Sequence, residues 1–196
     1  LRAGLQRNMD DAEHYAFPCD SVGPNGKGRF FDSYCNWHRI SEYRDFITQS
    51  PAAHLAAQFM RSDTVQLFHE HVFCKESGTQ TATPWHHDLP YYCVDGRQNI
   101  SIYVSLDSAP SSTAVRFLAG SHQSDQFPRH FVDGTDYVHD DEKMTSVTPL
   151  MNEVSEENIR SFDLEPGDVI LFDFRTLHGT TDAPIQDRRR AFSTRW

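Results

Sequence analysis

Apolar and polar positions divide the chain into a helical beginning and a longer part that alternates as β-strands do. Residues 41–47 and 50–60 have the spacing of helix-forming segments. The second is the stronger prediction, because Ser50 suits an N-cap, Pro51 suits the first helical position and several alanines follow. Residues 18–36 are rich in Gly, Pro, Asn and Asp, and are therefore predicted to form a loop.

From Thr64 onward the period of the pattern changes to two, which predicts strands. Over residues 64–75 this alternation places His69, His71 and Phe73 on one face. Further strands are predicted at residues 99–106, 113–118, 161–165, 168–174 and 190–196. Many strands after a helical beginning predict an α+β fold that is mainly β, with a sandwich or barrel as its core.

One long segment, residues 121–160, is polar, acidic and aperiodic. A loop of this length in a compact domain is either a solvated insertion or a functional lid, and the sequence leaves both open. Because 196 residues suffice for one sizeable core, we expect a single domain over residues 1–196. The chain begins without Met or a leader-like apolar core, and its final residues alternate up to the end. We therefore expect the extreme N- and C-terminal residues of the domain to be missing.

Composition argues against two classes of partner, which leaves a small molecule as the expected one. The net charge of −10 argues against nucleic acid or an anionic membrane surface, since binding to phosphate depends on Lys and Arg. No run of about 18 apolar residues exists to span a bilayer. The cysteines are far apart and form no CxxC motif, which indicates reduced thiols and a cytoplasmic location: Cys19, Cys35, Cys74 and Cys93.

Histidine is abundant, with 11 in 196 residues, and two of them are adjacent in Thr83–Tyr92, TPWHHDLPYY. If this segment is extended, His86 and Asp88 point to one side and His87 to the other. A second histidine ligand must then come from elsewhere, and the best candidate is His178, at the exit of an apolar strand. Two histidines and one carboxylate form the facial triad of non-haem Fe(II) oxygenases. That triad leaves positions for a chelating co-substrate and O2.

A chelating keto acid also needs a cation that holds its far carboxylate. The segment DRRRAFSTRW is a dense basic cluster in an otherwise acidic chain. Arginine suits this task, because its planar fork binds a carboxylate through two hydrogen bonds and stays charged. Arg189 lies eleven residues after His178, so a turn and a strand can return it to the metal. Arg188 and Arg190 lie on the opposite face, where we expect solvent or salt bridges.

The segments TPWHHDLPYY, VRFLAGSH, EPGDVILFDFRTLHGT and RRRAFSTRW resemble the phytanoyl-CoA dioxygenase family of Fe(II)/2-oxoglutarate oxygenases. The resemblance covers residues 64–120 and 161–196. It implies a double-stranded β-helix core (a jelly roll, cupin-like) with flanking N-terminal helices. It also implies that His86, Asp88 and His178 bind Fe(II), while Arg189 holds the far carboxylate of 2-oxoglutarate with the hydroxyl of Thr180 beside it.

In this family the strand at residues 65–75 supplies polar residues to the co-substrate pocket. This makes His71 and Lys75 candidate contacts of the co-substrate or substrate. A hydrogen-bonded core position for His71 and a solvated position for Lys75 are the alternatives. Three tyrosines either line the pocket or pack in the core: Tyr91, Tyr92 and Tyr103.

The resemblance also implies a reaction class. Halogenating relatives carry a small residue in place of the carboxylate ligand, so Asp88 favours hydroxylation of a C–H bond. Such a reaction consumes O2 and 2-oxoglutarate and releases succinate and CO2. The substrate is not identified by the sequence.

A rival metal site lies in HEHVFCKE, where His69 and His71 share a face and Glu76 follows. This resembles the metal motif of cupins, although the glycines that frame that motif are absent and alternation turns Glu76 away. On this alternative the chain is a cupin-like metal-binding isomerase or ligand-binding module without oxygen chemistry. The two functions differ at Arg189, because only the oxygenase needs a carboxylate clamp.

Overall fold

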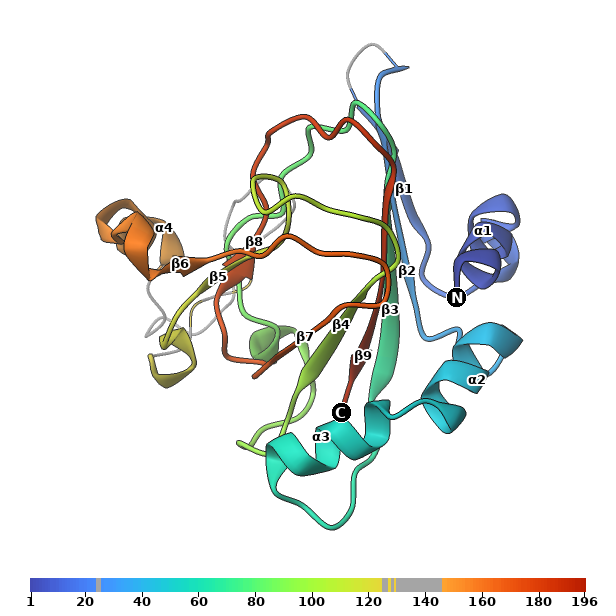
Figure 1. The fold of residues 1–196 in the computed structure, drawn as a ribbon, viewed down its shortest axis with the longest axis horizontal. Coiled ribbons are helices and arrows are strands. Elements are labelled where there is room, and N and C mark those ends of the chain that lie inside the picture. The colour runs from blue at the N-terminus through green and yellow to red at the C-terminus, as the bar shows by residue number, and fades with distance from the viewer. Residues whose placement is uncertain (24–25, 125–126, 128, 130–145) are drawn as a thin grey trace.

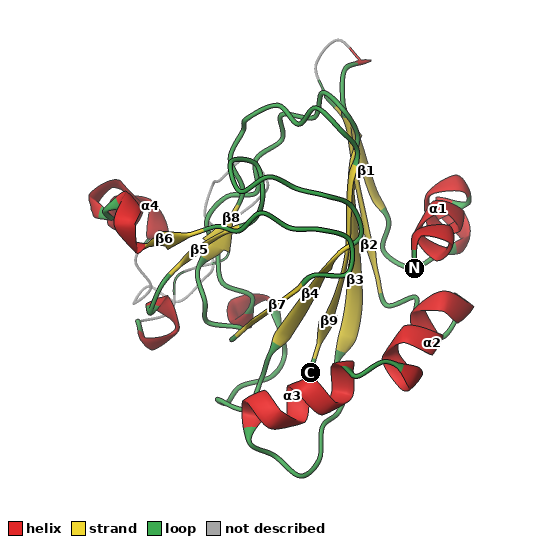
Figure 2. Cartoon of the chain, in the orientation of Figure 1, coloured by secondary structure: helices red, strands yellow, loops and turns green. Residues whose placement is uncertain are grey.

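The computed structural model describes residues 1–23, 26–124, 127, 129 and 146–196. Within them the chain forms two β-sheets, with helices against the larger one (Figures 1 and 2). The helices are α1 (Arg2–Asp10), α2 (Ser41–Gln49), α3 (Ala52–Met60) and α4 (Val147–Glu153), with 3₁₀ turns η1 (Ala12–His14), η3 (Leu89–Tyr91), η4 (Ser121–Gln123) and η5 (Glu156–Asn158). The strands are β1 (Cys19–Val22), β2 (Arg29–Tyr34), β3 (His69–Lys75), β4 (Ser101–Ser105), β5 (Arg116–Leu118), β6 (Ile159–Arg160), β7 (Val169–Phe172), β8 (His178–Gly179) and β9 (Arg189–Arg195).

The larger sheet has the antiparallel order β1-β2-β3-β9-β4-β7. Its central strand is β9, which pairs with β3 on one side and β4 on the other. Directly opposite residues of an antiparallel pair share a face. The register therefore aligns one row of polar side chains with another: Arg189 with Lys75, Ser193 with His71 and Arg195 with His69.

The prediction of a loop at residues 18–36 is wrong, because β1 and β2 form a hairpin there. β1 ends at Val22 and β2 begins at Arg29, so the loop-like composition reflects the short stretch between two strands. Residues Phe30–Tyr34 gain a ladder by pairing with β3, a long-range contact that local composition does not reveal. Gly28 is required at the turn, since its φ is +73° and an added Cβ would lie 2.5 Å from the Cα of Thr79.

Helices α1, α2 and α3 cover the convex face of the larger sheet (Figure 1). Both predicted helices form, as α2 and α3, whereas α1 was not predicted. The second begins one residue later than expected, at Ala52, whose N–H donates to Ser50 Oγ at 3.2 Å. The core between helices and sheet consists of fully buried side chains that include Leu5, Ile40, Tyr43, Val72, Ile102 and Phe192.

The smaller sheet has the order β6-β5-β8 and faces the concave side of the larger one, which completes a jelly roll (Figure 2). The strand predicted at residues 161–165 is wrong for most of its length. Only Leu164 forms a bridge there, with Ala109, and the ladder lies at residues 159–160 instead. The other predicted strands are present. The strand at the C-terminal end is shifted by one residue, as β9, and the rest are shorter; β3, for example, begins at His69 rather than Thr64.

Much of the segment at residues 121–160, predicted to be a solvated insertion or a lid, lies outside the described residues. Its described ends contain η4, α4, η5 and β6. None of the described helices has the length and apolar character needed to cross a membrane. All four cysteines are free thiols.

Candidate metal centre

His86 lies in the segment between β3 and β4 and forms an isolated antiparallel bridge with His178 of β8 in the smaller sheet. The N–H of His86 donates to the carbonyl of His178 at 3.0 Å, and the reverse bond measures 2.9 Å. Gly179 permits this close approach, because an added Cβ would lie 2.8 Å from the carbonyl oxygen of Thr83. The bridge fixes the two imidazole rings beside each other, with centroids 4.3 Å apart.

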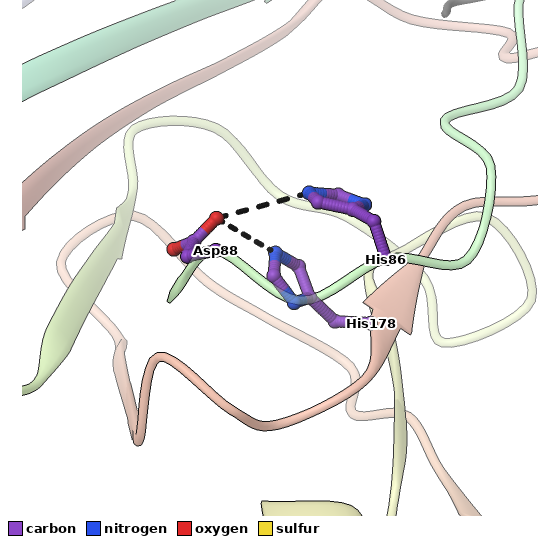
Figure 3. A group of neighbouring side chains, drawn as sticks. All are labelled: His86, Asp88 and His178. Atoms are coloured by element: carbon purple, nitrogen blue, oxygen red, sulfur yellow. Dashed lines mark ion pairs between the residues drawn. The ribbon is translucent and has the colours of Figure 1, made fainter. Parts of the chain in front are cut away.

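Asp88 joins the pair, as Figure 3 shows. Its Oδ1 lies 3.8 Å from Nε2 of His86 and 3.8 Å from Nε2 of His178. Together these residues offer three ligand atoms that all lie within 4.8 Å of one another. The backbone turns into η3 at Asp88, yet its carboxylate lies on the His86 side, as alternation predicts.

The donors are arranged for a cation rather than for one another. Each imidazole donates its Nδ1–H to a carbonyl two residues earlier, His86 to Pro84 at 2.9 Å and His178 to Thr176 at 2.8 Å. This turns both Nε2 lone pairs toward Asp88. Burial lowers the pKa of His86 to about 4 and also lowers the pKa of His178, so both rings are neutral near pH 7.

The pKa of Asp88 falls below its usual range. Burial raises this pKa, but interactions that favour the anion outweigh it, the largest being the charge of Arg195, so the carboxylate is ionised. An anion and two neutral nitrogen donors facing one point fit a divalent transition metal.

The second oxygen of Asp88 is held by residues that the sequence analysis missed. Ser101 Oγ donates to Asp88 Oδ2 at 2.9 Å, and Arg195 Nη2 lies 3.5 Å from the same atom. Arg195 is buried and also donates from Nε to the Tyr92 hydroxyl at 3.0 Å. Alternation along DRRRAFSTRW already places Arg195 on the face of Arg189, which is the signal that could have identified it.

His87 points away from the triad, as its position in the alternation predicts. It is nevertheless fully buried, with Nδ1 bonded to the carbonyl of Arg175 at 3.1 Å. Its Nε2 accepts the N–H of Phe127 at 2.9 Å. Burial lowers its pKa to about 4, so this ring is a neutral linker between two segments.

Lys75 and Arg189 form a buried pair of cations. They lie on the same face of the larger sheet as Arg195, at the opposite end of the β3–β9 ladder. They are paired in the β3–β9 ladder and are 7% and 9% exposed, which excludes a solvated Lys75. Lys75 Nζ donates to the carbonyl of Thr81 at 2.6 Å and to Thr180 Oγ1 at 3.0 Å. Arg189 donates to the carbonyl of Thr113. Burial and the charge of Arg189 lower the pKa of Lys75 to about 8.

The neighbouring arginines lie in salt bridges elsewhere. Arg188 Nε lies 2.8 Å from Glu76 Oε2, and Arg190 binds Asp107 through two bonds of 2.8 Å and 2.7 Å. Glu76 is thereby directed away from His69 and His71. His71 Nε2 contacts Asp32 Oδ1 at 3.1 Å. Among the described residues, the cupin-like set does not gather into a group of metal ligands.

A cavity of about 740 Å³ connects these features. The triad lies in its wall, together with the buried cations Lys75 and Arg189. The lining also includes the other candidates from the sequence: His69, His71, Thr180, Tyr91, Tyr92 and Tyr103.

A jelly roll with a His-Asp-His triad inside it defines the architecture of the non-haem metal oxygenases. The profile of the phytanoyl-CoA dioxygenase (PhyH) family matches residues 3–191. The chain belongs to this family.

Solved structures share its fold at low identity. AviO1 from Streptomyces viridochromogenes Tue57 is 20% identical, with a TM-score of 0.71 over 99% of this chain and 80% of that one. EvdO2 from Micromonospora carbonacea var. aurantiaca, complexed with 2-oxoglutarate, is 22% identical, with a TM-score of 0.64 over 98% and 79%. The epimerase SnoN, in complex with Fe3+, alpha ketoglutarate and nogalamycin RO, is 17% identical, with a TM-score of 0.65 over 98% and 73%. Among curated proteins, none matches the sequence significantly.

Proposed function

We propose that this protein is an Fe(II)- and 2-oxoglutarate-dependent dioxygenase that hydroxylates a C–H bond of a small organic substrate, releasing succinate and CO2. The observation that carries the proposal is a single cavity with the His86, Asp88 and His178 triad and the buried Lys75–Arg189 pair in its wall. A metal site alone needs only the triad. A cation pair in the wall of the same cavity is what a chelating keto acid requires for its second carboxylate.

Two of the similar structures support this choice of cofactors. EvdO2 was solved with 2-oxoglutarate, and SnoN with Fe3+ and alpha ketoglutarate. Family membership adds the same expectation, and the donor set of this chain fits iron by its chemistry.

The protein's own residues would hold the cofactors in a fixed orientation. Iron bound with 2-oxoglutarate and O2 supplies the oxidising power for breaking a C–H bond. His86 and His178 would bind it through Nε2, and Asp88 through Oδ1. The carbonyls of Pro84 and Thr176 keep the rings from turning.

Thr180 has a defined part in binding the co-substrate. Its Oγ1 accepts from Lys75 Nζ at 3.0 Å and from the N–H of Thr83 at 2.8 Å. Because both lone pairs are occupied, its own O–H is free to donate to a carboxylate in the cavity. Lys75, Arg189 and Thr180 would together hold the far carboxylate by charge-assisted hydrogen bonds.

Hydroxylation is the finer part of the proposal, since SnoN, with the same fold, is an epimerase. Asp88 supports it over halogenation, because the carboxylate occupies the position that a halide would take. Turnover under isotopically labelled O2 tests the outcome directly. We expect one labelled atom in the product and the other in succinate. Labelled succinate with an unlabelled product would replace hydroxylation by another oxidation, and absence of succinate would refute the oxygenase function.

A further inference from the structure

The cavity offers few charges to a substrate. Its charged lining residues among the described part of the chain are Asp32, Lys75, Asp88, Arg189 and Arg195. Lys75 and Arg189 are committed to the co-substrate on the proposed function. Asp32 contacts His71 at 3.1 Å, and Arg195 lies 3.5 Å from Asp88. An anionic substrate group would lose its water in this cavity and find the remaining cation of the described lining, Arg195, already in an ion pair with Asp88, which is costly.

Aromatic side chains gather instead at the cavity's rim. Five aromatic residues of the described chain are exposed, and three of them line this one cavity: Phe17 at 59%, Phe68 at 38% and Tyr91 at 39%. Exposed aromatic rings are rare enough that clustering at a cavity mouth indicates a binding surface. Phe17 stacks on Tyr34 with centroids 4.7 Å apart and an interplanar angle of 6°.

The stack depends on a strained backbone conformation at Phe17. Phe17 has a φ of +48°, a left-handed conformation that a bulky side chain seldom adopts. Such strain is typical of ligand-binding positions, where the surrounding structure imposes it. Here it places a ring on the solvent side of Tyr34 rather than in the core.

The rings continue inward to the metal ligands. Tyr34 lies 6.0 Å from the ring of His69, and His69 lies 5.2 Å from Tyr92, at its edge. Tyr91 contacts the ring of His86 at 6.0 Å. His69 belongs to this aromatic surface as a neutral ring, since burial lowers its pKa to about 4. The aromatic wall therefore leads from the rim to the triad.

We infer that the part of the substrate bound in this cavity carries no anionic group and has a flat or extended ring system that stacks on Phe17 and Tyr34. The inference rests on the proposed function, which assigns Lys75 and Arg189 to 2-oxoglutarate. It excludes a polyanionic group, such as that of a coenzyme A thioester, from the cavity.

Two fluorescent probes with the same rings test the inference: N-phenylnaphthylamine, which is uncharged, and its sulfonated analogue anilinonaphthalene sulfonate. Each is titrated into the protein loaded with Fe(II) and 2-oxoglutarate under nitrogen. We expect the uncharged probe to bind at least about tenfold more tightly. Phe17→Ala and Tyr34→Ala should each weaken it about three- to tenfold, the value of one aromatic contact. Phe162→Ala, at an exposed ring outside the cavity, is the matched control and should change nothing.

Three results would overturn the inference: equal or tighter binding of the sulfonate, no binding of the uncharged probe, or binding that both rim variants leave unchanged. The visible charge-transfer band of the Fe(II)–2-oxoglutarate complex is recorded in the same samples. If the wild-type protein shows no band, the proposed function fails. If the band is present and the probes behave otherwise than expected, only the substrate inference fails.

Discussion

The guanidinium of Arg195 lies 3.5 Å from Oδ2 of Asp88, while Oδ1 of the same carboxylate faces both histidines. The side chains of this ion pair are only 5% and 6% exposed. Arg195 therefore compensates the charge of a candidate metal ligand from the side opposite the two histidines. The two oxygens of Asp88 have separate tasks, one toward a metal and one toward the protein.

Replacement of Arg195 by Met should destabilise the metal-free protein by about 3–5 kcal/mol, because the buried carboxylate of Asp88 loses its cation. A divalent metal should then restore more stability to the variant than it adds to the wild type, since it supplies a positive charge. Thermal unfolding with and without Co(II) measures both effects. Arg188→Met, at an exposed salt bridge with Glu76, is the control and should cost well under about 1 kcal/mol. Equal stability of metal-free wild type and Arg195→Met would contradict this account of Asp88.

The adjacent histidines should differ in metal binding. His86→Ala removes a ligand, so stoichiometric binding of Fe(II) or Co(II) should be lost. His87→Gln should lower stability, because it disturbs the buried bonds to Arg175 and Phe127, but should retain one metal per chain. Metal analysis after dialysis measures this difference, and loss of metal from both variants would contradict the assignment of His87.

Arg188 and Arg189 are adjacent in the sequence but point to opposite faces at the start of β9, so matched variants of the two test how the co-substrate is bound. Arg189→Gln should raise the KM for 2-oxoglutarate by about a hundredfold, as expected for loss of a buried charge-assisted contact of about 3 kcal/mol. Arg188→Gln should leave this KM unchanged, because Arg188 points to Glu76 on the other face. Succinate production measures both. Similar KM values for the two variants would remove Arg189 from the clamp.

Affinity for 2-oxoglutarate should depend on pH through Lys75. Burial lowers the pKa of its ammonium to about 8, so in the free protein the charged form dominates below this pH and the neutral form above it. Only the charged form attracts a carboxylate. The dissociation constant should therefore be flat below pH 7 and rise about tenfold per unit above pH 8. Calorimetry on the Co(II)-loaded protein measures this, with Lys75→Met expected to bind weakly and without that slope. An identical slope in the variant would assign the titration to another group.

Alternation along single strands predicted a large part of the site. It placed His86 with Asp88, turned His87 away and set Arg189 apart from Arg188 and Arg190, because these relations depend only on period two. The return of His178 to His86 is a long-range bridge. It followed from the requirements of metal chemistry and the family resemblance rather than from local pattern.

What escaped prediction depended on pairing between distant segments. Ser101 reaches Asp88 only because β4 lies beside β9, with Ser101 opposite Arg195. The sequence predicts a loop at the hairpin of β1 and β2 because Gly-rich residues dominate the local composition, whereas the ladder depends on pairing with the distant β3. Whether residues 1–196 form one domain, and whether the expected location is cytoplasmic, stay predictions.

The central claim is that the triad and the buried cations bind Fe(II) and 2-oxoglutarate together. The visible spectrum under nitrogen, recorded as Fe(II) and then 2-oxoglutarate are added, tests it most directly. We expect a charge-transfer band that saturates at one equivalent of each, that is lost in His86→Ala, and that needs far more 2-oxoglutarate in Arg189→Gln. Absence of the band in the wild type, or an unchanged band in His86→Ala, would contradict the claim.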